Sequence, residues 1–257
     1  MQIRNAMSAD IITVRPEDTL REAARRMSEQ GAGSAVVDPG EAGARPGIVT
    51  EQDLLDSVAA GQNPDDERVA DHFTPDAVTV SPDSSLEQAA EEMASGGFRH
   101  LLVIEGNETV GIVSMRDVVE RWTDRVELPG VNTSVRDAMN PDVPIVELED
   151  TLREAARRMY EQGVGAAVVD PAEAGSHPRI VTMREVLHSV GAGQDPDAER
   201  VADHLAPSTT FSAPNWMLVQ AAEAMVKADL QHAVVVDGDE TVGIISMREL
   251  VRDLTNR

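Results

Sequence analysis

The chain has no cysteine, a single lysine and few aromatic residues, and each shortage excludes a class of protein. Without cysteine in 257 residues, disulfides, thiolate metal sites and cysteine nucleophiles are excluded. Aromatic residues make up 2 % of the chain, so the interior must be built from aliphatic residues and methionine. Scarce aromatics and a net charge of -24 also argue against nucleic-acid binding, which needs basic residues against phosphates.

The start of the chain and the length of its apolar runs indicate a cytoplasmic protein. Residues 1–5, Met-Gln-Ile-Arg-Asn, lead into polar sequence and not into the apolar segment of a signal peptide. No apolar run approaches the roughly 18 residues that a membrane-spanning helix needs. We therefore expect no membrane partner.

The charged residues are skewed in type as well as in sign. Twenty-one Arg and Lys227 stand against 46 Asp and Glu. Lysine depletion beside enrichment in acidic residues resembles the proteomes of organisms that accumulate salt. The composition favours a halophile's cytoplasm, with an ordinary acidic protein as the alternative.

One sequence unit recurs four times at a constant spacing of 66 residues. Each copy contains the octet Leu-x-x-Ala-Ala-x-x-Met, whose apolar residues lie on one face of a helix. Residues 18–72 also match 150–204 without a gap, with 40 of 55 positions identical. The chain therefore consists of two tandem modules of two related repeats each. The octets begin at Leu20, Leu86, Leu152 and Leu218.

Each repeat is expected to have the element order β-α-β-β-α, which makes the fold class α+β. In the first repeat we expect a strand at 11–14, a helix at about 19–30, strands at 34–37 and 47–49, and a helix after Thr50. The predicted repeats occupy 1–62, 68–127, 133–194 and 200–257, with Gly-, Pro- and Asp-rich linkers at 61–68, 127–132 and 193–200 and a longer loop at 170–179.

The repeats are similar to a known domain. Residues 7–20, Met-Ser-Ala-Asp-Ile-Ile-Thr-Val-Arg-Pro-Glu-Asp-Thr-Leu, and residues 47–53, Gly-Ile-Val-Thr-Glu-Gln-Asp, resemble the CBS domain, named after cystathionine β-synthase. This resemblance implies four CBS repeats paired into two Bateman modules, whose clefts commonly bind adenine nucleotides or related ligands. It implies a non-catalytic regulatory or sensor protein with an adenosine-containing ligand.

A Ser or Thr precedes an acidic residue by three positions where a strand leads into a helix in each repeat. Free N–H groups at a helix start can hold a phosphate, and a carboxylate can accept from ribose hydroxyls. In the family that the repeats resemble, the hydroxyl contacts phosphate and the acid contacts ribose. The same spacing is also a capping box that needs no ligand. The four pairs are Thr50 and Asp53, Ser114 and Asp117, Thr182 and Glu185, and Ser246 and Glu249.

Few basic side chains are placed to meet a phosphate. Arg99 and His100 enter the strand at 101–104, where many CBS domains have basic phosphate ligands, and Gln231 and His232 are their counterparts in the fourth repeat. Acidic surroundings are expected to raise the pKa of either histidine. Each histidine is equally well explained as a satisfied or solvent-facing side chain.

Other charged residues allow two interpretations. Arg116, Arg184 and Arg248 stand just before the motif acids and could reach a phosphate or pair with surface carboxylates. The acidic run at 65–67 reads as a solvated loop, and we expect no metal site.

The second module departs from the pattern of the first. Arg179 replaces the glycine at the head of the motif, and Glu185 and Glu249 replace aspartate. Adenine nucleotide is therefore expected to prefer residues 1–127.

Motifs of common enzymes are absent from the sequence. It has no Gly-x-Ser-x-Gly, no His-Glu-x-x-His and no Gly-x-x-x-x-Gly-Lys. We expect neither catalysis nor a cofactor. A ligand-free interaction scaffold and a regulatory subunit of a separate enzyme or transporter are the alternatives, with a second copy of the chain or an unknown regulated protein as partner.

The charge predicts that folding depends on salt. A net charge of -24 must be screened before the modules can pack, and the Debye length falls to about 3 Å near 1 M salt. The melting temperature, followed by circular dichroism, should rise between roughly 0.1 M and 2 M KCl. An unchanged melting temperature would remove the physical support for the halophilic interpretation.

Overall fold

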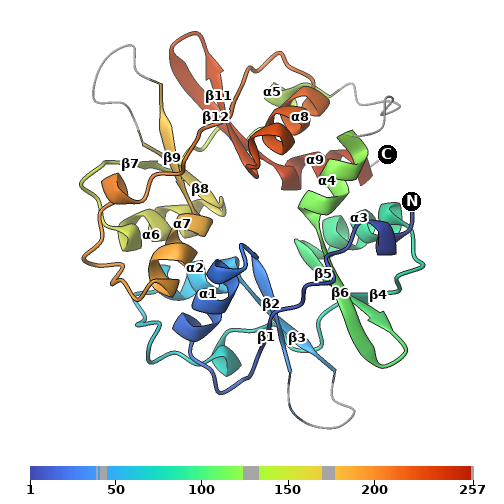
Figure 1. Ribbon diagram of the computed structural model, residues 1–257. Coiled ribbons are helices and arrows are strands. Elements are labelled where there is room, and N and C mark those ends of the chain that lie inside the picture. The colour runs from blue at the N-terminus through green and yellow to red at the C-terminus, as the bar shows by residue number, and fades with distance from the viewer. Residues whose placement is uncertain (39, 41–44, 124–132, 170–176, 256–257) are drawn as a thin grey trace. The chain divides into compact units, whose positions relative to one another are not determined.

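The computed structural model describes residues 1–38, 40, 45–123, 133–169 and 177–255 (Figure 1). In this part of the chain, four three-stranded sheets alternate with helices. Contacts divide the chain into two compact units. Unit 1 comprises Met1–Asp10, Val78–Val143 and Ser208–Arg257, and unit 2 comprises Ile11–Ala77 and Pro144–Pro207. Unit 1 thus holds the bulk of the second and fourth repeats, and unit 2 that of the first and third.

The four repeats have the expected element order. The first contains β1 (Thr13–Val14), α1 (Leu20–Glu29), β2 (Ser34–Val37), β3 (Gly47–Thr50) and α2 (Glu51–Ala59). The second contains β4 (Thr79–Val80), α3 (Leu86–Gly96), β5 (His100–Glu105), β6 (Glu108–Ser114) and α4 (Met115–Thr123). The third contains β7 (Ile145–Val146), α6 (Leu152–Gln162), β8 (Ala166–Val169), β9 (Arg179–Thr182) and α7 (Met183–Gly191). The fourth contains β10 (Phe211–Ser212), α8 (Leu218–Ala228), β11 (His232–Asp237), β12 (Glu240–Ser246) and α9 (Met247–Thr255).

Each sheet has one parallel and one antiparallel strand pair. The middle strand pairs in parallel with the first strand of the repeat, across the intervening helix, and antiparallel with the third. The α+β fold class is confirmed. The expected linker at 127–132 and residues 170–176 of the expected loop lie outside the described residues.

The octet face is buried, as its periodicity predicts. In α1, Leu20, Ala23, Ala24 and Met27 are each at most 2 % exposed, and the corresponding residues of α3, α6 and α8 are buried as well. Thr19 caps α1 by accepting a hydrogen bond from the N–H of Glu22. The two alanines leave little side chain between helices, so a facing helix can approach closely.

Short lead-in segments, which the sequence reading did not predict, precede each repeat at the same 66-residue spacing. Each begins with an aliphatic residue that is 0 % exposed. The segments are η1 (Ile3–Asn5), η2 (Val69–Asp71), α5 (Val135–Ala138) and η3 (Val201–Asp203).

The lead-ins are exchanged within each tandem pair. The N–H of Ile3 donates to the carbonyl of Ser84 in the second repeat, whereas the N–H of Val69 donates to the carbonyl of Asp18 in the first. The third and fourth repeats exchange theirs in the same way, from Val135 and Val201. Within each tandem module, the lead-in segment that precedes one repeat therefore binds the other repeat.

Helices join the first and third repeats within unit 2. Helix α1 lies against α7, and α2 against α6 (Figure 1). The approach is closest at Gly191 of α7, where an added Cβ would stand 2.9 Å from the carbonyl oxygen of Ala24. Gly191 is therefore required by the proximity of α1.

An arginine from α1 secures this pairing by binding the C-terminal end of α7. Arg21 Nη1 donates to the carbonyl oxygens of Val190, at 2.6 Å, and Gln194, at 3.1 Å. Its Nε binds Asp65 at 2.6 Å, and the side chain is only 18 % exposed. A cation here satisfies carbonyls that have no partner within the helix and complements its dipole.

The third repeat makes the equivalent arginine contact to the first repeat. Arg153 of α6 donates to the carbonyl oxygens of Val58 and Gln62 at the end of α2. In unit 1, Glu87 and Val219 occupy the positions equivalent to Arg21 and Arg153. The helix pairs of unit 1, α3 with α9 and α4 with α8, are therefore held without these two arginine caps.

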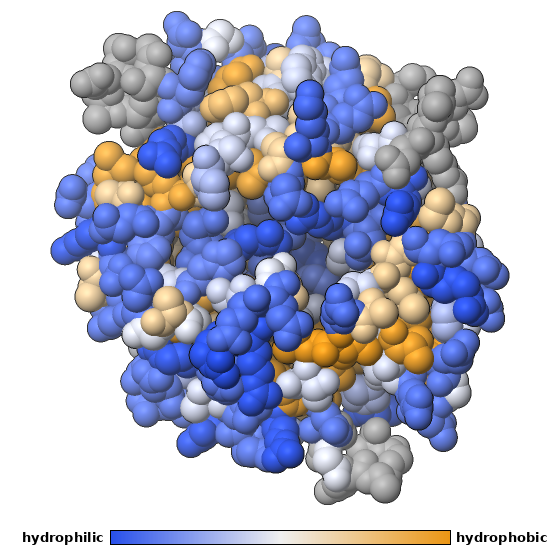
Figure 2. Space-filling model, in the orientation of Figure 1, coloured by the Kyte–Doolittle hydropathy of each residue, from blue (hydrophilic) through white to orange (hydrophobic). Residues whose placement is uncertain are grey.

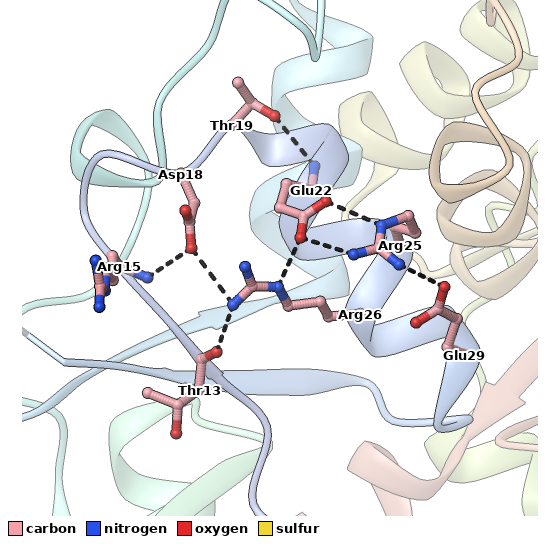
Figure 3. Close-up of polar contacts among 8 residues, drawn as sticks. All are labelled: Thr13, Arg15, Asp18, Thr19, Glu22, Arg25, Arg26 and Glu29. Atoms are coloured by element: carbon pink, nitrogen blue, oxygen red, sulfur yellow. Dashed lines mark hydrogen bonds and ion pairs between the residues drawn. The ribbon is translucent and has the colours of Figure 1, made fainter.

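The surface is hydrophilic and rich in local ion pairs. In the view of Figure 2, hydrophilic residues cover most of the visible face and hydrophobic residues form separate groups. On α1, Glu22 accepts from Arg25 and from Arg26, and Arg25 also binds Glu29 (Figure 3). These bonds from Arg25 and Arg26 lower the pKa of Glu22 to about 2.

Loss of the Arg21 cap is expected to destabilise the chain. Arg21→Ala leaves the carbonyls at the end of α7 without their charged donor, which should lower the free energy of unfolding by about 1–3 kcal/mol. Arg25→Ala, on the same helix, removes only exposed ion pairs and should have a much smaller effect. Denaturant unfolding of the full chain measures both, and equal losses would show that the cap contributes nothing specific.

Candidate functional site

The motif residues lie where the third strand of each sheet leads into a helix. Ser114 ends β6, and Asp117 lies in the first turn of α4. Between them, the N–H of Met115 donates to the carbonyl of Arg99 at 2.9 Å, which places the motif beside the start of β5. The corresponding bonds join Glu51 to Gly33, Met183 to Gly165 and Met247 to Gln231.

Each motif acid accepts two hydrogen bonds from its own Ser or Thr. Asp117 Oδ2 accepts from the backbone N–H of Ser114, at 2.7 Å, and from its Oγ, at 2.6 Å. Glu185 Oε2 accepts the same two bonds from Thr182, at 2.9 and 2.5 Å. The arrangement is repeated in the pairs Thr50–Asp53 and Ser246–Glu249. Capping is thus present in all four repeats, and the longer glutamate caps as well as aspartate does.

Asp117 combines this capping role with burial. Removal from water raises its pKa above the usual value, although the two bonds from Ser114 oppose the shift. Its Oδ1 makes no hydrogen bond to the described residues. Asp117 therefore presents an acceptor oxygen in a half-buried position, where it can accept from a bound hydroxyl.

The expectation that acidic surroundings raise the pKa of His100 and His232 is wrong. Burial lowers the pKa of each to about 3, with a further contribution from the positive charge of Arg99. His232 is 6 % exposed, and Nδ1 of His100 makes no hydrogen bond to the described residues. Both imidazoles are therefore neutral at pH 7 and can exchange hydrogen bonds with a ligand but supply no charge.

Unit 1 brings together basic residues that are far apart in the sequence. The charges of Arg99 and Arg248 both act on His232, so residues of the second and fourth repeats share one electrostatic environment. The positions equivalent to Arg99, His100, Gln231 and His232 in unit 2 are Gly33, Ser34, Gly165 and Ala166. The basic residues thus distinguish unit 1 from unit 2, whereas the predicted preference for residues 1–127 stays a prediction.

The three motif arginines differ in their partners. Arg116 forms ion pairs with Asp229 of the fourth repeat and, at 3.2 Å, with Glu120 of its own helix. Within the described residues, Arg184 and Arg248 form no ion pair. Pairing with surface carboxylates therefore accounts for Arg116 only.

Two residues near the motifs were not singled out from the sequence. Glu51 is the first residue of α2 and is 2 % exposed, where the other repeats have methionine. A Cβ at Gly33 would lie 3.4 Å from the Glu51 carboxyl group, which is ordinary van der Waals contact. Asp229 occupies a turn in which the preceding repeats have glycine, and this substitution is the sequence signal that could have identified it.

The described ranges contain neither a metal-ligand cluster nor a membrane-spanning helix. No three His, Asp or Glu side chains there are grouped as a metal site would require. None of the helices in those ranges combines the length and apolarity needed to cross a bilayer.

Burial of neutral histidine makes stability depend on pH. His232 has a pKa of about 3 when folded, below the ordinary histidine value of 6.5, so the unfolded chain binds more protons between these pH values. The stabilisation is complete above pH 6.5 and is lost as the pH falls, at up to about 1.4 kcal/mol per pH unit. His232→Gln should flatten the dependence of unfolding free energy on pH between about 4 and 6 by up to this slope. Parallel curves for wild type and variant would contradict the assignment, and a constant offset between them would report lost packing only.

Comparison with known proteins agrees with this architecture. Uncharacterized protein MK0525 of Methanopyrus kandleri is 35 % identical over 113 residues, which cover 43 % of this chain and 57 % of that protein. The structure of MJ1225 from Methanocaldococcus jannaschii superposes with a TM-score of 0.78 at 19 % identity, over 98 % of this chain and 99 % of that one. PAE2072 from Pyrobaculum aerophilum, solved in complex with AMP, is 26 % identical over 46 % of this chain and 89 % of that one, with a TM-score of 0.42.

The repeats are also recognised individually. The family model for the CBS domain matches residues 3–60, 69–124, 135–192 and 211–256. These matches cover each of the four repeats and most of the chain, and the MJ1225 structure has the same fold over nearly its whole length. The chain belongs to the CBS domain family and contains four CBS domains.

Proposed function

We propose that this protein is a non-catalytic regulator that binds an adenosine-containing nucleotide such as AMP, ADP or ATP. The observation that carries the proposal is the gathering of Arg99, Arg248 and the buried His232 in unit 1, beside two motif helices, in a chain whose net charge is -24. Two arginines close to one buried histidine, in a chain with a large excess of acidic residues, indicate a site for an anionic ligand.

The residues of unit 1 suit the parts of a nucleotide. Backbone N–H groups at the start of α4 and α9, with the hydroxyls of Ser114 and Ser246, would donate to phosphate. The carboxylates of Asp117 and Glu249 would accept from ribose hydroxyls. Arg99 would balance phosphate charge, while neutral His100 and His232 would contribute hydrogen bonds.

The corresponding residues of unit 2 complete the proposed set. Thr50 with Asp53, and Thr182 with Glu185, have the same local geometry but small neighbours at the strand start. Without basic residues at these positions, they would bind AMP much more weakly than the residues of unit 1. We further propose that the protein acts in a high-salt cytoplasm, through a second copy of the chain or a regulated protein.

An interaction scaffold is the second candidate. It is favoured by one observation: all four motif acids are engaged in capping contacts that are complete without a ligand. A scaffold would behave identically with and without nucleotide. A thermal-shift screen of AMP, ADP and ATP in molar KCl separates the candidates, and release of a nucleotide product would instead indicate an enzyme.

Removal of a motif acid separates binding from capping. Both Asp117→Ala and Glu185→Ala lose a helix cap, which should lower the free energy of unfolding by about 1 kcal/mol in each case. Only Asp117→Ala should also weaken AMP binding, by about ten- to a hundredfold, because a charge-assisted bond to ribose is lost near the cations. Titration calorimetry on the full chain measures the affinities. Equal weakening by Glu185→Ala would place the site elsewhere, and no weakening by Asp117→Ala would leave capping as the motif's role.

A further inference from the structure

Asp229 stands in a backbone conformation that the other repeats reserve for glycine. It follows α8 with φ at 60°, and the residues at the same 66-residue spacing are Gly31, Gly97 and Gly163, with φ of 63°, 72° and 63°. A non-glycine residue in this left-handed region is disfavoured, although Asp and Asn tolerate it better than most. An aspartate here needs a compensating contact.

The Asp229 carboxylate makes that contact across unit 1. It forms an ion pair with Nη2 of Arg116, which belongs to the second repeat and stands immediately before the motif acid Asp117. The Arg116 side chain is 19 % exposed, and its Nε also binds Glu120. Both neighbours of this guanidinium are therefore carboxylates of the chain itself.

The equivalent arginine of the fourth repeat has no such carboxylate opposite it. Arg248 is the counterpart of Arg116 in the fourth repeat, and Gly97 is the counterpart of Asp229 in the second. Within the described residues, Arg248 forms no ion pair. Of two equivalent arginines in one unit, one is neutralised by an acid from the opposite repeat and the other is not.

We propose that Asp229 is a built-in competitor for the anionic part of the ligand, which occupies Arg116 and directs a phosphate to Arg248. The proposal rests on the proposed function, since it concerns the phosphate of the same nucleotide. Asp229 mimics that phosphate by placing an anionic oxygen beside the guanidinium. Binding at the second repeat must displace this carboxylate, whereas binding at the fourth repeat meets an available cation.

The test compares AMP and ATP affinities of full-length variants by titration calorimetry, at the lowest KCl concentration at which circular dichroism shows the fold to be complete. Asp229→Asn retains a residue that tolerates the left-handed backbone but removes the charge. It should bind AMP about three- to tenfold more tightly, and added KCl should diminish the gain. Adenosine, which has no phosphate, should bind both proteins equally.

Three further single variants and one double variant assign the effect. Asp237→Asn removes an equal charge from unit 1, where Asp237 pairs with exposed Arg136, and should leave the AMP affinity unchanged. Arg248→Gln should weaken AMP binding in the wild-type chain, whereas Arg116→Gln should have little effect there. In the Asp229→Asn background, Arg116→Gln should abolish the gain.

Each outcome decides between the inference and the function on which it rests. If wild type binds AMP and Asp229→Asn binds no more tightly, the proposed function stands and the competitor role is overturned. The competitor role is also overturned if Asp237→Asn gives the same gain. Binding by Asp229→Asn alone would support the competitor role strongly. If neither protein binds AMP or ATP, both proposals fall together.

Discussion

Close approach of helix backbones is the constraint on which both compact units depend. The paired alanines of the octet in α1 place no long side chain between α1 and α7. Gly191 of α7 has no Cβ, which would otherwise collide with the backbone of α1. Short helices of this kind bury little area singly, so their stability comes from packing in pairs. Arg21 and Arg153 then bind the helix ends that the close approach brings within reach.

The helices of the repeats could be predicted from periodicity because the apolar residues of each octet recur at the spacing of one helix face. Ile3 and Val69 could not be placed, since a single buried aliphatic residue in one helical turn produces no periodic pattern. The charge of His232 was misjudged because composition reports an average environment, whereas its pKa is set by local burial. The glycine-to-aspartate change at 229 is visible in the aligned repeats, but its partner Arg116 is known only from the fold.

The motif itself shows why residue types alone do not separate structure from function. A hydroxyl and a carboxylate three positions apart satisfy a helix start in every repeat, whether the acid is Asp53 or Glu185. What differs between repeats is the neighbourhood: Arg99 beside one motif, Gly33 beside another. The repeats therefore differ at the start of the strand that precedes the motif's strand, whereas the motif itself has the same geometry in all four.

Exchange of the lead-in segments has a consequence for synthesis of the chain. Ile3 completes the core of a repeat whose helix begins at Leu86, so Ile3 must wait for a segment that leaves the ribosome some 80 residues later. Val69, in turn, completes the first repeat only after η2 has emerged. During translation Ile3 stays without its native partner until the second repeat appears. The first repeat thus has its lead-in before the second repeat is made, whereas the lead-in of the second repeat is made ahead of the whole first repeat, so the two lead-ins reach their partners in a fixed order.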